Sequence, residues 1–185
     1  MARHPLQPRL PVQPTRRLAG FTLIEALVSI VVMSIGVLAL ARLQAQTLVD
    51  GRSASMRNIA TMLAYNLADQ VRSNEAAQAA GYYNLPGATP TAACYSTAGC
   101  TPQQMAVTSY KVWLDEAGSA LPGGYGTVCI DSTPGDGTPS NPQCDNAPNA
   151  PYAIKIWWQD DLTHSGTAST TASPPMSLFV TTLVP

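Results

Sequence analysis

Four cysteines carry the first chemistry that the residue types suggest: Cys94, Cys100, Cys129 and Cys144. An even number of cysteines suits a disulfide framework in an exported domain, with three possible connectivities. Zinc is the alternative, but the spacings contain no C-x₂-C pair and do not fit a zinc site. We predict the pairs Cys94–Cys100 and Cys129–Cys144, because each pair closes a loop rich in Pro, Gly and Ser. A crossed pair such as Cys94–Cys129 would overturn this arrangement.

Groups suited to catalysis are scarce in this sequence. The two histidines, His4 and His164, have no nucleophile or ligand partner at motif spacing. The chain contains no G-x-S-x-G, Walker or H-E-x-x-H motif. With a net charge of −1, nothing indicates a nucleic acid or another polyanionic partner. The sequence therefore predicts a protein that is not an enzyme and needs no cofactor.

Three acids beside a Gly-rich stretch, Asp131, Asp136 and Asp145, are candidates for a metal site. Carboxylates bind calcium, but the D-x-[DN]-x-[DN]-G pattern of calcium loops is absent. A turn-rich loop closed by a disulfide accounts for the same residues. We predict no metal, and calcium stays an open alternative.

A further acid, Glu25, is the sole charged residue in the stretch 20–41. A carboxylate within a membrane-spanning helix costs about 2.5–3.5 kcal/mol at the centre and less near an end. Glu25 therefore needs a reason to be there. Either it makes a specific contact, or its side chain reaches water at the membrane surface.

The apolar run that contains this acid is long enough to cross a bilayer. A helix over residues 21–41 would span about 30 Å. Arg16 and Arg17 precede the run and Arg42 closes it, and a basic leader marks the cytoplasmic side. A secretory signal peptide has its small-residue cleavage site after the apolar region, whereas here the small residue, Gly20, comes before it. A buried helix of a globular protein is the alternative.

Residues 20–25, Gly-Phe-Thr-Leu-Ile-Glu, resemble the type III signal of type IV pilins and pseudopilins. The resemblance implies that a prepilin peptidase cuts between Gly20 and Phe21 and N-methylates Phe21. It also implies that Glu25 is an assembly contact, which meets the amino group at the start of a neighbouring subunit. Such an amino group is largely cationic at neutral pH.

The same resemblance implies an inner-membrane anchor with a cytoplasmic N-terminus, a periplasmic head and a later place in an extracellular pilus. Residues 1–20 would be the leader, which has four prolines and no acid. It is longer than many pilin leaders, so the true start codon stays open. Residues 21–42 would form the transmembrane helix, 43–80 its amphipathic continuation, and 81–185 the head.

The continuation of the helix carries an apolar stripe with members three or four residues apart: Met56, Ile59, Leu63, Leu67 and Val71. Such a stripe predicts a packing partner in the head. A coiled coil is the alternative, but the stripe is short and irregular for heptads.

The head is expected to begin with a loop and then a helix over residues 102–120. Thr101 and Gln104 form a capping box, and Pro102 fits the first helical position. A strand over residues 107–114 is the alternative, because that stretch is rich in β-branched and aromatic residues. The partial apolar face of the helix would comprise Met105, Val112, Trp113 and Leu121.

Three strands are predicted after this helix, over residues 126–131, 152–159 and 176–184. Trp157 and Trp158 are adjacent in the second strand, so they point to opposite faces. We expect one of them in the core and regard the other as a candidate for an exposed binding patch. The predicted fold is α+β and pilin-like, with a long N-terminal helix packed on a small antiparallel sheet, an extra helix and disulfide-bearing loops.

Residues 63–74, 121–146 and 154–160 resemble the PilV family of type IV pilus modification proteins, which are minor pilins. This resemblance implies a minor pilin that takes part in pilus assembly or initiation, with the prepilin peptidase and other major and minor pilin subunits as partners. A large tip adhesin is a further possible partner. The alternatives are a minor pseudopilin of a type II secretion system and an adhesive binding module at the pilus tip.

Overall fold

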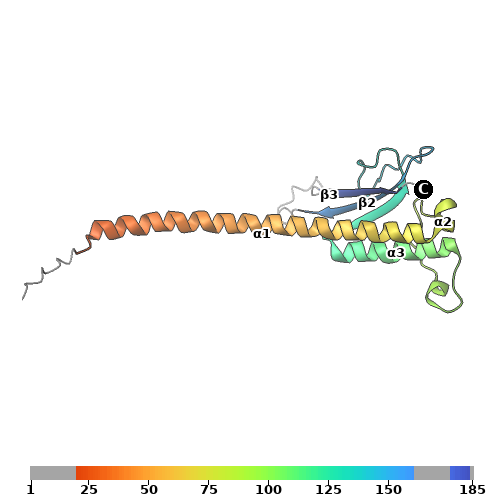
Figure 1. Cartoon of the computed structure of the whole chain (residues 1–185), viewed down its shortest axis with the longest axis horizontal. Coiled ribbons are helices and arrows are strands. Elements are labelled where there is room, and N and C mark those ends of the chain that lie inside the picture. Colours follow the sequence, from red (N-terminus) through yellow and green to blue (C-terminus); the bar gives the residue numbers. More distant parts are fainter. Residues whose placement is uncertain (1–19, 161–175, 184–185) are drawn as a thin grey trace, which may run out of the picture. The chain divides into compact units, whose positions relative to one another are not determined.

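The computed structural model describes residues 20–160 and 176–183. Its contacts divide the chain into two units, Met1–Thr47 and Leu48–Pro185. The first helix, α1 (Leu23–Ser73), contributes residues to both units (Figure 1).

The first unit is the apolar part of α1. The Thr22 carbonyl accepts hydrogen bonds from the amides of Glu25 and Ala26 at 3.1 and 3.2 Å, which starts the helix. The hydroxyls of Ser29 and Ser34 donate to carbonyls four residues earlier, both at 2.7 Å. A lipid environment requires such internal partners for polar groups. Every described residue of this unit is exposed, and α1 is long and apolar enough to cross a membrane.

The second unit begins with the remainder of α1, which buries one face in the head. The buried residues are Met56, Ala60, Leu63, Ala64, Leu67, Ala68 and Val71. Ile59 packs against them from a partly buried position. The predicted stripe is therefore confirmed. Three alanines complete it, because small side chains let neighbouring elements approach the helix closely.

The helix that was expected to continue to residue 80 ends at Ser73, and a short helix α2 (Glu75–Ala79) follows. Asn74 between them has φ −112° and ψ 62°, outside the helical region. Its side-chain amide donates to the Pro102 carbonyl at 2.9 Å. A tertiary contact thus stabilises the break, and neither Gly nor Pro marks it in the sequence.

Helix α3 (Pro102–Ala120) confirms the predicted helix and rules out the alternative strand. The Thr101 hydroxyl accepts from the Gln104 amide at 3.2 Å, and the Gln104 side chain accepts from the Thr101 amide at 2.9 Å. The predicted apolar face was partly wrong, because Met105 and Val112 are 43% and 51% exposed. The apolar face that α3 buries has the expected helical spacing and comprises Ala106, Tyr110, Trp113 and Ala117, and Thr108 is buried as well.

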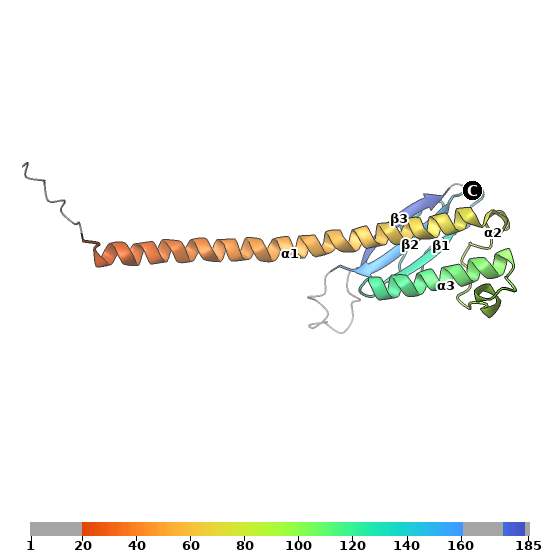
Figure 2. The ribbon, with the colours of Figure 1, turned by 60° about the horizontal axis from the view of Figure 1, so that its bottom comes forward.

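Three antiparallel strands form one sheet in the order β1 (Tyr125–Ile130), β2 (Tyr152–Gln159) and β3 (Met176–Leu183). The predicted strands agree to within one residue, although residue 184 lies outside the described residues. The part of α1 in this unit and α3 lie side by side over the sheet (Figure 2). This arrangement confirms the predicted pilin-like α+β fold.

Buried hydrogen bonds join α3 to the side of the sheet that faces it and to α1. The Tyr110 hydroxyl donates to the Gly126 carbonyl at 3.1 Å, and the Trp113 indole N–H donates to the Leu63 carbonyl at 2.8 Å. A Cβ atom on Gly126 would lie 2.3 Å from the Trp113 ring, so this position needs glycine. Burial raises the pKa of Tyr110 to about 12.

The opposite side of β2 is covered by residues 131–151, which we call the cover loop. Strand alternation places Lys155 and Trp157 on this side, and they are 0% and 2% exposed. Trp158 lies in the core beneath the helices, as the alternation allowed. The expectation that one of the two tryptophans is exposed is wrong, because the sheet is covered on both sides.

The cysteines pair as Cys94–Cys100 and Cys129–Cys144, with Cα atoms 4.9 and 6.1 Å apart. These are the two pairs predicted from the loop composition. The first bond closes the loop that contains the short 3₁₀ helix η1 (Ala92–Tyr95). The second bond joins β1 to the cover loop.

Candidate functional site

The predicted cleavage site lies immediately before α1. Gly20, Phe21 and Thr22 precede the first helical residue, and Phe21 is 75% exposed. No described atom lies within 4 Å of the position that a Cβ on Gly20 would take. A peptide bond outside a helix and free of packing is accessible to a peptidase, so this geometry suits a cut between Gly20 and Phe21.

Glu25 lies in the first turn of α1, where a negative charge interacts favourably with the helix dipole. Its side chain is exposed, and none of the ion pairs among the described residues involves it. The carboxylate is therefore available for a contact with another molecule. A cationic group would suit it best.

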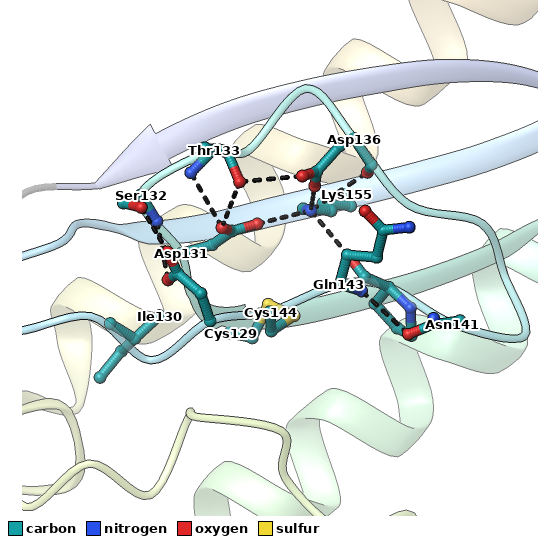
Figure 3. A network of polar contacts seen from close by, with 12 residues as sticks. Cys129, Ile130, Asp131, Ser132, Thr133, Asp136, Asn141, Gln143, Cys144 and Lys155 are labelled. Carbon is teal, nitrogen blue, oxygen red and sulfur yellow. Dashed lines mark hydrogen bonds and ion pairs between the residues drawn. A yellow bond between two sulfur atoms is a disulfide. The ribbon is translucent and has the colours of Figure 1, made fainter.

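A second polar site, which the sequence analysis missed, lies between β2 and the cover loop (Figure 3). Its centre is Lys155, whose side chain is 0% exposed. The ammonium donates to the Asp136 carbonyl at 3.1 Å, to Asp136 Oδ1 at 2.9 Å and to the Pro142 carbonyl at 2.8 Å. Asp131 Oδ2 lies 2.5 Å from Nζ. A lysine in the middle of an otherwise apolar strand was the signal that could have pointed to this site.

Asp131 is the second fully buried charge of this cluster. Its Oδ1 atom accepts from the Thr133 amide at 2.9 Å, and the Thr133 hydroxyl lies 3.4 Å away. Its Oδ2 atom makes no hydrogen bond with the described residues and forms an ion pair with Lys155 Nζ. A buried charge is tolerated only when it is paired, so these two side chains depend on each other.

Two other carboxylates of the cover loop have lowered pKa values. A hydrogen bond from Lys155, followed by one from Thr133, lowers the pKa of Asp136. Hydrogen bonds to Asp145, first from the Ser132 side chain, lower the pKa of that carboxyl. Both acids therefore stay ionised at neutral pH and hold the loop in its turn-rich conformation.

The three candidate calcium ligands do not share one centre. Asp131 and Asp136 face the Lys155 ammonium, which occupies the position that a cation would take between them, whereas Asp145 faces Ser132. Cys129, Asp131 and Cys144 do lie close together, with ligand atoms within 4.8 Å of one another. The two sulfur atoms are bonded to each other and are not thiolates, so this group is not arranged to hold a metal.

A cavity of about 410 Å³ lies beside the cover loop, next to Trp157. Its described lining comprises Gly137, Thr138, Pro139, Ser140, Trp157, Met176 and Leu178. None of these described residues carries a charge, so they supply no acid or base for catalysis. An uncharged ligand is the kind that it would suit.

Comparison with known proteins adds one match. The model of the prokaryotic N-terminal methylation motif matches residues 15–41 of this chain. These residues include Gly20, Phe21 and Glu25 and most of the apolar run. No curated protein and no solved structure matches the chain.

Proposed function

We propose that the chain is a minor type IV pilin of the PilV kind. One observation carries this proposal: the methylation motif lies at the start of an apolar helix that is followed by a helix-on-sheet head. The motif supports a pilin or pseudopilin role and indicates a structural subunit rather than an enzyme. It is also consistent with anchoring in the inner membrane before transfer to a pilus.

In this proposal the prepilin peptidase removes residues 1–20 and methylates the amino group of Phe21. The new N-terminus lies one helical turn from Glu25, so each subunit presents both a cation and an anion near the start of its helix. The anion of one subunit then binds the cation of the next. Pairing offsets the penalty of placing a carboxylate in an apolar surrounding.

Mass spectrometry of the protein from cells that contain a prepilin peptidase tests this proposal. The mature chain should begin at N-methylated Phe21, and Gly20→Leu should leave the leader uncut. Gly20→Ala is the matched control and should still be cut, because alanine is the next smallest residue. A wild-type chain that keeps its leader in such cells would overturn the pilin role.

A minor pseudopilin of a type II secretion system is the second candidate, since the leader motif is common to both classes. The disulfide-bearing loops favour the pilus over the secretion system. Deletion of the gene separates the two: loss of surface pili with normal protein secretion supports the pilin, and the reverse result supports the pseudopilin. An adhesive role at the tip is a third candidate, favoured only by the uncharged cavity beside Trp157.

A further inference from the structure

The cluster around Lys155 holds an amine and a carboxyl in contact without a hydrogen bond between them. An ammonium has three N–H donors. Asp136 accepts two of them, through its carbonyl and Oδ1, and the Pro142 carbonyl accepts the third. Asp131 Oδ2 nevertheless lies 2.5 Å from Nζ, and it makes no hydrogen bond in the described part of the chain. Asp131 Oδ2 therefore contacts Nζ beside the three oxygen atoms that accept its hydrogen bonds.

The surroundings favour a neutral product over this pair of charges. Both side chains are 0% exposed, and removing two such charges from water has an effective penalty of several kcal/mol for each ion. Two reactants that a fold holds in contact also react as if at a very high concentration, on the order of 10⁵–10⁸ M. Burial excludes the water that would reverse a condensation.

A route for the protons is present in the same cluster (Figure 3). Asp136 Oδ1 lies 2.9 Å from Lys155 Nζ, and Asp136 Oδ2 accepts from the Thr133 hydroxyl at 2.8 Å. The same hydroxyl lies 3.4 Å from Asp131 Oδ1. The four side chains thus form a continuous chain of polar contacts, along which protons can move from the amine, through Asp136 and Thr133, to the oxygen of the Asp131 carboxyl.

We propose that Lys155 and Asp131 become joined by an intramolecular amide bond. Asp136 takes a proton from Nζ, and the amine then attacks Cγ of Asp131 to form the C–N bond. One C–O bond of Asp131 breaks, and its oxygen leaves as water with two of the three ammonium protons. The remaining N–H belongs to the amide, both charges disappear, and no oxidant or reductant is needed.

This bond would link β2 to the residue that follows β1, close to the Cys129–Cys144 disulfide. The cover loop would then stay attached to the sheet even after the disulfide is reduced. The inference concerns only the head, so it is independent of the proposed place in a pilus.

The mass of the full chain tests the proposal. We expect the protein, purified from membranes and then reduced and alkylated, to be lighter than its sequence by one water. Trypsin should fail to cut after Lys155, so that residues 112–185 stay in one product. Lys111 is the control within the chain, because it pairs with Asp115 on the exposed surface of α3 and should still be cut. A chain of full sequence mass that is cut after Lys155 would overturn the proposal.

Variants distinguish the Lys155–Asp131 amide from other modifications that lower the mass of the chain by one water. Asp131→Ala and Lys155→Arg should each restore the full mass, and Asp136→Asn should leave a fraction of the chains without the bond. An unchanged yield of the bond in Asp136→Asn would overturn the proton route. A cyclic imide at Asp136–Gly137 also loses one water, but hydroxylamine cleaves it and Lys155 remains open to trypsin. That result in the wild-type chain would overturn the amide.

Discussion

Glu25 is a single carboxylate on an apolar surface, and the proposed role in assembly can be tested by removing this carboxylate. We expect Glu25→Ala to insert into the membrane and be processed normally, because the change removes an anion from the apolar segment. Incorporation into pili should fall by more than about tenfold, since an uncompensated charge would remain on the neighbouring subunit, at a cost of about 3–5 kcal/mol if that charge is buried.

Immunoblots of sheared pili and of membranes measure this ratio. Glu25→Asp is the matched control, because it keeps the carboxylate near its position and should retain part of the assembly. Equal incorporation of Glu25→Ala and the wild type would show that the carboxylate is not the assembly contact.

Tyr110 gives the head a dependence on alkaline pH. A tyrosine in the unfolded chain ionises near pH 10, whereas burial raises the pKa of Tyr110 in the fold to about 12. Between these values the folded state binds more protons than the unfolded state, so the free energy of unfolding falls as pH rises and is unaffected below about pH 10.

Tyr110→Phe should make this fall shallower, and urea unfolding on both sides of pH 10 measures the difference. The free energy of unfolding of the variant should still fall somewhat with pH, because burial also raises the pKa of Tyr152. The same slope in the variant and the wild type would contradict the assignment to Tyr110.

At the scale of elements, the packing of α3 on β1 depends on the missing side chain of Gly126. We expect Gly126→Ala to destabilise the head by about 1–3 kcal/mol, the usual penalty of overpacking, because a Cβ there would lie 2.3 Å from the Trp113 ring. Urea unfolding followed by tryptophan fluorescence measures the loss.

Gly135→Ala is the matched control for this experiment. No described atom lies within 4 Å of a Cβ at that position, and its φ is not in the left-handed region. The control should change the free energy of unfolding little. A similar loss in both variants would show that the contact with Trp113 is not its cause, because replacing glycine by alanine lowers the entropy of the unfolded chain and by itself favours folding.

The elements themselves were largely predictable, and the reasons are local. The capping box at Thr101 marked the start of α3, and alternation with β-branched residues marked β2. The end of α1 was not predictable, because Asn74 leaves the helix for a contact with Pro102, a residue distant in the sequence. The same limit applies to Tyr83, which is 0% exposed although it lies in a segment that reads as a loop.

The residues of the two candidate sites were likewise predictable only in part. Gly20, Phe21 and Glu25 stand in a contiguous motif that the sequence displays directly. The pairing of Lys155 with Asp131 and Asp136 was hidden, since strand periodicity says which side a residue faces but not what covers that side. The burial of Trp157 was missed for the same reason.

At the scale of the molecule, the two disulfides should contribute unequally to stability. Cys129 and Cys144 are 15 residues apart and Cys94 and Cys100 are 6 apart. Chain entropy alone gives about 3 kcal/mol for the longer loop and about 2.4 kcal/mol for the shorter one. Cys129 is also 0% exposed within β1, so its replacement should disturb the sheet as well.

We therefore expect Cys129→Ser to lower the free energy of unfolding more than Cys94→Ser does. Denaturant unfolding of the two variants under identical conditions measures this order. Peptide mapping without reduction checks the pairing in the exported protein, and a Cys94–Cys129 peptide would contradict it. An equal loss in both variants would mean that the cover loop is held without its disulfide.

The cover loop has a consequence for how this protein can diverge. None of residues 132–150 is buried, and the loop meets the sheet through Cys144, the acceptors of Lys155 and the Asn146 amide, which donates to the Ile130 carbonyl at 3.0 Å. Most of its positions can therefore change with little loss of buried contact. In a lineage of such proteins the loop should drift, while the lysine, its aspartates and the cystine persist.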